Sequence, residues 1–105
     1  MTTEDMIEAF IKAGVDAYKK LNKNSVEGRK LYRHEKVTIE GYEFTCWREY
    51  ATYKMGEYIK DTLPDCNVEI VLDGNDSTLK IEVTDAEQEK LNRLMFLFLQ
   101  EQGYL

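Results

Sequence analysis

Six consecutive apolar residues, LMFLFL from Leu94 to Leu99, lie near the end of this 105-residue chain. Upstream of them, Thr84 is followed three residues later by Glu87, the spacing of a helix capping box. This cap and its charged lead-in predict a terminal helix that ends near Gly103. A strand over the apolar run is the alternative, because a short apolar run does not distinguish the two by period alone.

A helix that carries this run cannot bury all of it on one face, because successive residues step round the axis by ~100°. One set of side chains is expected to pack on the core: Leu91, Leu94, Met95 and Phe98. A second set then needs another cover: Phe96, Leu97 and Leu99. That cover could be an N-terminal helix of the same chain, a second copy across a two-fold axis, or a different protein.

The N-terminal segment predicts a second helix. Thr2 or Thr3 supplies a hydroxyl cap, and the acidic pair Glu4–Asp5 suits the positive end of a helix dipole. Apolar residues then recur every three or four positions as far as Leu21. Residues 22–28, NKNSVEG, lack this period and are interpreted as a polar loop.

Residues 34–47 show the alternation of a short hairpin around a turn at 40–41, Glu-Gly. With a two-residue turn, Ile39 pairs with Tyr42 and Val37 with Phe44. The same register extends to the pairs Glu35 with Cys46 and His34 with Trp47, so that Tyr32, His34, Lys36 and Trp47 share one outward sheet face.

Residues 48–63 carry apolar side chains on one helical face and end at Pro64, which predicts a third helix. Residues 65–83 show the clearest strand alternation in the chain, interrupted by the turn DGNDS at 73–77. The predicted fold is therefore α+β in the order α-ββ-α-ββ-α. Each strand has one apolar side, so a four-stranded antiparallel sheet with helices mainly on one face is the simplest arrangement.

Length and composition limit the class of protein. At 105 residues, with 43% hydrophobic residues, residues 1–105 are expected to form a single domain. No basic leader with an apolar segment opens the sequence, and no run is long enough for a membrane span, so a cytoplasmic location is expected. Cys46 and Cys66 stand alone, which favours buried free thiols.

Catalytic and cofactor motifs are absent from the pattern. The single histidine, His34, has no partner serine or cysteine in any motif, and no glycine-rich phosphate loop is present. The DGNDS turn lacks the spacing of a calcium loop. We therefore expect no catalytic residues, no cofactor and no metal, which favours a protein that is not an enzyme. An enzyme that acts through converging carboxylates and tyrosines is the alternative.

The net charge of −6 is unevenly distributed. Residues 19–36 hold seven Lys or Arg against two acidic residues, a net of +5, while the rest of the chain sums to −11. This asymmetry could orient a partner. One hypothesis is a nucleic-acid-associated accessory protein that uses the basic segment 29–36, with these contacts: Lys30, Tyr32, Arg33, His34, Lys36 and Trp47.

The leading hypothesis is a non-enzymatic protein-interaction module that forms a homodimer. A small acidic protein can occupy a basic surface, so an inhibitor, immunity or anti-defence protein of a bacterium or phage is the more specific interpretation. The expected acidic contacts are Asp73, Asp76, Glu82, Asp85, Glu87 and Glu89. The expected partner interface is Phe96, Leu97, Leu99, Tyr50 and Tyr53, since tyrosine is enriched in interfaces.

Overall fold

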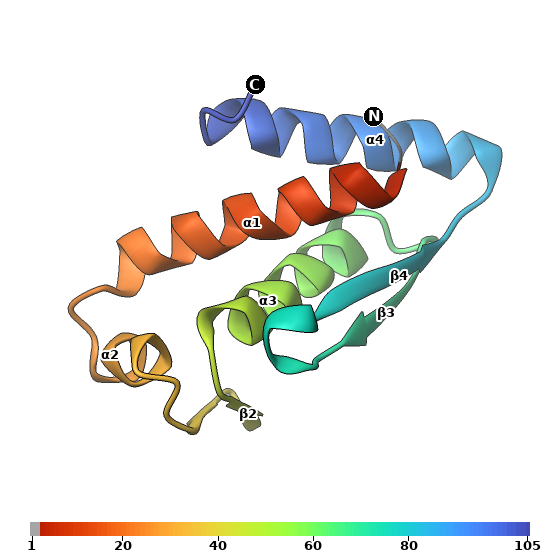
Figure 1. Cartoon of the computed structure of the whole chain (residues 1–105). Coiled ribbons are helices and arrows are strands. Elements are labelled where there is room, and N and C mark those ends of the chain that lie inside the picture. The colour runs from red at the N-terminus through yellow and green to blue at the C-terminus, as the bar shows by residue number, and fades with distance from the viewer. Residues whose placement is uncertain (1–2) are drawn as a thin grey trace.

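The computed structural model describes residues 3–105, which form four α-helices and four short strands (Figure 1). Thr2, one of the two predicted caps of the first helix, lies outside these residues. The elements follow one another along the chain as α1 Thr3–Asn22, α2 Val26–Tyr32, β1 Val37–Ile39, β2 Tyr42–Phe44, α3 Trp47–Thr62, β3 Asn67–Val71, the 3-10 turn η1 Gly74–Asp76, β4 Thr78–Glu82 and α4 Asp85–Glu101.

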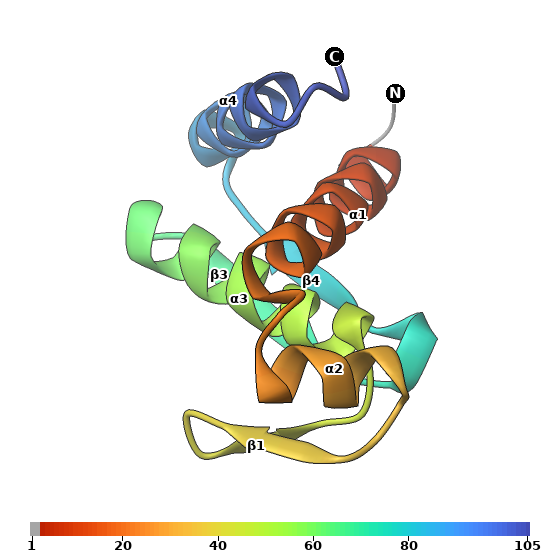
Figure 2. The same cartoon turned by 90° about the vertical axis from the view of Figure 1, so that its left-hand side faces the viewer.

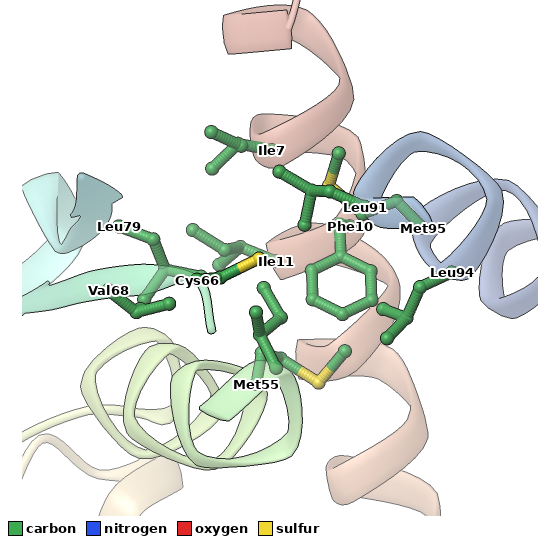
Figure 3. Close-up of a cluster of buried hydrophobic side chains, with 11 residues drawn as sticks. Ile7, Phe10, Ile11, Met55, Cys66, Val68, Leu79, Leu91, Leu94 and Met95 are labelled. Atoms are coloured by element: carbon green, nitrogen blue, oxygen red, sulfur yellow. The ribbon is translucent and has the colours of Figure 1, made fainter. Parts of the chain in front are cut away.

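Helix α1 is the central element of the main core. It lies between α4 and α3 (Figures 1 and 2). The ring of Phe10 packs edge-on against Phe98 of α4, with the ring centroids 5.1 Å apart. Ile11 belongs to the same cluster, with Leu79 of the second hairpin and Met55 of α3 (Figure 3). Phe10 and Ile11 are both fully buried, so α1 connects α4 on one side with α3 and the second hairpin on the other.

The single four-stranded sheet predicted from the sequence is wrong: the strands form two separate two-stranded antiparallel sheets. Strands β1 and β2 pair with each other, and β3 and β4 pair with each other. In the β1–β2 hairpin two predicted pairs are confirmed, Ile39 opposite Tyr42 and Val37 opposite Phe44. In the β3–β4 hairpin Val68 lies opposite Ile81. The element order is close to the predicted one, with α2 added.

The two hairpins stay apart because each buries its apolar face on a different part of α3. Hairpin β3–β4 packs at Gly56, where an added Cβ would lie 2.5 Å from Cγ1 of Ile70. The absence of a side chain there allows the helix and the hairpin to approach closely. Hairpin β1–β2 instead joins a second cluster at the start of α3: Leu31, Val37, Phe44 and Trp47.

Helix α2 corrects the prediction of a polar loop at 22–28 and a strand through Tyr32, His34 and Lys36. Ser25 caps α2 by accepting a hydrogen bond from the amide of Gly28 at 2.9 Å. His34 then takes a left-handed conformation with φ 59°, which ends the helical segment before β1 begins at Val37. The pairs Glu35 with Cys46 and His34 with Trp47 therefore do not form, because β1–β2 is only three residues long on each side.

Helix α4 has the predicted capping box: Thr84 and Glu87 exchange hydrogen bonds at its start. Leu91, Leu94 and Met95 are buried as expected, although they pack mainly along α1 rather than against a sheet. Leu99 is buried as well, at 1% exposure, so it is covered within the same chain. Within residues 3–105, no helix is long and apolar enough to cross a membrane.

Two polar side chains, Arg48 and Glu49, fix the start of α3. The guanidinium of Arg48 donates two hydrogen bonds to the carboxylate of Glu8 on α1, at 2.8 and 2.7 Å, and a third to the carbonyl of Ser77 at 2.8 Å. Glu49 accepts hydrogen bonds from the amide of Thr45 at 2.7 Å and from the amide of Gly74 at 3.0 Å. Both residues thus attach the β3–β4 turn to the first turn of α3.

The Glu49 contact predicts acid sensitivity. Partial burial opposes ionisation of Glu49, but the hydrogen bonds from Thr45 and Gly74 outweigh it and hold its pKa below the ordinary 4.5. A lowered folded-state pKa contributes stability above the ordinary value, and that contribution is lost as pH falls through the folded-state pKa. We therefore expect Glu49→Gln to lower the free energy of unfolding at neutral pH and to flatten its decline below pH 4.5.

Urea unfolding at several pH values measures this effect. Glu43→Gln, a change at an exposed carboxylate of β2, is the matched control and should leave the decline nearly unchanged. An equally steep decline in the Glu49→Gln and unaltered proteins would show that the contacts of Glu49 do not contribute.

Candidate functional site

A basic hollow lies between the C-terminal part of α1, helix α2 and the first residue of α3. Five cationic side chains line it: Lys19, Lys20, Lys23, Arg29 and Arg33. Tyr32 and Trp47 contribute two aromatic rings, and the cavity volume is about 460 Å³. No acidic side chain is among its lining residues. We call this site the basic hollow.

Gly28 sets the distance between the two helices that form the basic hollow. A Cβ added at Gly28 would lie 2.0 Å from the backbone carbonyl oxygen of Asn22, at the end of α1. Ser25 closes the link between the helices, because its hydroxyl also donates to that carbonyl at 2.9 Å. Arg29 of α2 and Arg33, which directly follows α2, are thereby brought beside the lysines at the end of α1.

Most of these cations form no ion pair in the part of the chain that the structure describes. Over residues 3–105, no ion pair engages Lys19, Lys20, Lys23 or Arg29. Arg33 differs, because Glu35 accepts two hydrogen bonds from its guanidinium, at 3.0 and 3.1 Å, and these contacts raise the pKa of Arg33. Lysines at the end of α1 suit the negative end of its dipole, but this does not account for the arginines that α2 adds.

The two rings of the basic hollow differ in exposure. Trp47 is 6% exposed and belongs to the second core cluster, whereas Tyr32 is 74% exposed. Tyr32, Trp47 and Lys19 also border a second, larger hollow of about 720 Å³ that includes His34 and Arg48. At its far side, the hydroxyl of Tyr104 donates a hydrogen bond to Asp16, which also raises the pKa of Tyr104.

The residues predicted as nucleic-acid contacts are only partly brought together. Tyr32, Arg33 and Trp47 line the basic hollow, and His34 lines the adjoining one. Lys30 and Lys36 do not line either hollow. Reasoning from the sequence placed Arg29 in the basic segment 29–36 but missed Lys19, Lys20 and Lys23 as members of the same site. Their signal was the charge excess over residues 19–36, which includes all of them.

The outer face of α4 is the second candidate surface. Phe96 is 45% exposed and Leu97 is 49% exposed, between Arg93 and Gln100, which are also exposed. A shallow pocket lies at the edge of this face, lined by Phe96, Asn92 and Met6 of α1. Leu99, predicted as part of this interface, is instead buried within the chain.

Tyr50 and Tyr53, also predicted as interface residues, are partly buried by aromatic contacts within the chain. The ring of Tyr50 contacts the rings of Tyr18 and Phe44, both with centroids 5.4 Å away. The ring of Tyr53 contacts Tyr42, with the centroids 4.8 Å apart. These two tyrosines therefore already support the second core cluster.

The predicted acidic contacts lie in two separate groups rather than one patch. Asp73 and Asp76 lie in the turn before β4, while Glu82 is the last residue of β4. Asp85, Glu87 and Glu89 follow in the first turns of α4, and the carboxylate of Glu87 is engaged in the capping box. Strand β4 thus separates the two groups.

Potential metal ligands do not converge: residues 3–105 contain no group of three or more His, Cys, Asp or Glu side chains placed to hold an ion. Cys46 and Cys66 are both buried free thiols. Burial raises the pKa of the Cys66 thiol, which disfavours the reactive thiolate. Comparison with protein families, with curated proteins and with solved structures found no match for this chain.

Gly28 provides a test of how the basic hollow is built. We expect Gly28→Ala to destabilise the protein by about 1–3 kcal/mol, because the new Cβ would force α2 away from a backbone atom that cannot yield easily. Trp47 emission should change in the folded variant, since Trp47 lies beside Gly28 in the same lining.

Val26→Ala, at a 57% exposed position of the same helix, is the control. Thermal unfolding followed by circular dichroism gives the stability of both variants. Equal stability of the two variants would contradict the close contact between α2 and the end of α1.

Proposed function

We propose that this protein is a non-enzymatic interaction module that associates with a second copy of itself through the outer face of α4. The observation that carries the proposal is the half exposure of Phe96 and Leu97 on a helix whose opposite side is fully buried. Large side chains left in contact with water favour a partner that covers them.

An antiparallel two-fold contact suits this face. With the axis between Phe96 and Leu97, each Phe96 meets the Leu97 of the second copy, and Arg93 comes opposite Gln100 and Glu101. A two-fold interface uses the same patch twice, so it gains from this self-complementary order of an apolar centre with a cation and an anion at its ends.

The expected dimer is weak. Burying a Phe or Leu side chain completely contributes roughly 1.5–3 kcal/mol, and each of these four side chains is already about half covered. The total gain of about 3–6 kcal/mol is reduced by the rotational and translational freedom lost on association, so we expect a dissociation constant no tighter than tens of micromolar and as weak as several millimolar. The charge of −6 on each copy opposes association, so added salt should strengthen it.

The wider role that we propose is occupation of a basic surface on another macromolecule, as an inhibitor or immunity protein does. The support is electrostatic: Glu82, Asp85 and Glu89 are exposed near the junction of β4 and α4. Opposite charge steers a partner and raises the rate of encounter.

Sedimentation velocity over a concentration series tests the self-association. We expect the dimer fraction to rise with protein concentration and with salt, and the double substitution Phe96→Ser with Leu97→Ser to remove it. Both side chains are about half exposed, so the variant should remain folded.

The matched control is Leu21→Ser, which removes a 77% exposed leucine from α1, away from α4. It should leave the dimer fraction unchanged. A protein that shows no self-association up to about 5 mM, or that dimerises equally well after the double substitution, would exclude this interface.

A further inference from the structure

We propose that the basic hollow is a binding site for a nucleotide, either free or exposed in a single strand. Five cationic side chains from α1 and α2 converge there on a cavity with two aromatic rings and no acidic lining residue. The site is independent of the self-association proposed for α4, from which it is separated by α1 (Figure 2).

The charge of the hollow calls for a multivalent anion. Like charges that converge without internal partners repel one another, and a bound phosphate removes this repulsion. In a chain of net charge −6, the four cations that have no ion pair within residues 3–105 stand beside one another rather than beside the abundant acids. Arginine and lysine together offer forked and point-like donors to phosphate oxygens.

The aromatic lining selects a ligand with a ring as well as a phosphate. Tyr32 presents a 74% exposed ring at the edge of the hollow, against which a base can stack. Trp47 forms an apolar wall that is held in place by the second core cluster. The cavity volume of about 460 Å³ lies in the usual range of small-molecule sites.

The basic segment 29–36 recognised in the sequence is not the site as such. Lys36 stands outside the hollow, while Lys19 and Lys20 come from α1 and Lys23 directly follows that helix. The proposed ligand therefore bridges two helices, and Gly28 holds those helices together.

Trp47 is the only tryptophan of the chain, so its fluorescence reports directly on the hollow. Thymidine 5′-monophosphate, an oligothymidylate of about eight nucleotides, inorganic phosphate and polyglutamate are titrated at low ionic strength, with calorimetry in parallel. We expect saturable quenching by the monophosphate, the oligonucleotide or both, and competition by inorganic phosphate only at higher concentration. Binding of the monophosphate indicates a free nucleotide, and binding of the oligonucleotide alone indicates a strand.

Two substitutions separate the hollow from general charge. Arg29→Glu, at an exposed and unpaired position of the described chain, should weaken binding by about tenfold or more. Lys80→Glu makes the same charge change on the exposed side of β4 and should have little effect. Tyr32→Ala should weaken the nucleotide but not inorganic phosphate.

Several results would overturn the proposal. These are no binding of either nucleotide ligand at low ionic strength, binding by calorimetry without a change at Trp47, and equal losses from Arg29→Glu and Lys80→Glu. Polyglutamate that binds as tightly as the nucleotides would show that the hollow recognises acidic protein segments instead.

Discussion

The position of α1 between two layers is the constraint on which the rest of the structure depends. Phe10 reaches α4 while Ile11 lies in the cluster with α3 and the β3–β4 hairpin, and both are fully buried. Helix α4 packs mainly along α1, so the inner face of α4 is buried only when α1 is formed. The C-terminal end of α1 carries lysines of the basic hollow, so α1 links the core to the proposed nucleotide site.

Local patterns in the sequence predicted most elements because each depends on nearby residues. Thr84 and Glu87 fix the start of α4, and the left-handed residues Glu40 and Gly41 fix the turn between β1 and β2. Which surfaces pack together was not predicted. Both hairpins have one apolar face, and nothing in that alternation shows that Phe44 joins Trp47 while Leu79 joins Met55. Such a choice depends on tertiary packing rather than on local preference.

The candidate site shows the same division. The charge excess over residues 19–36 was visible in the sequence, but the missed helix α2 concealed its geometry. Helix α2 has seven residues, one of them a glycine, and a segment of this length is too short to show a helical period in the sequence. Once Ser25 caps α2 and Gly28 approaches Asn22, Arg29 and Arg33 come beside the lysines of α1, a grouping that a strand could not have produced.

Native-state hydrogen exchange followed by NMR tests the central place of α1 most directly. If α1 joins all layers, the amides around Phe10 and Ile11 should exchange only through global unfolding, with the highest protection in the protein. The amides of α4 should show equal or lower protection, because α4 depends on α1. Fast exchange in the middle of α1, while α3 and the β3–β4 hairpin remain protected, would contradict this account.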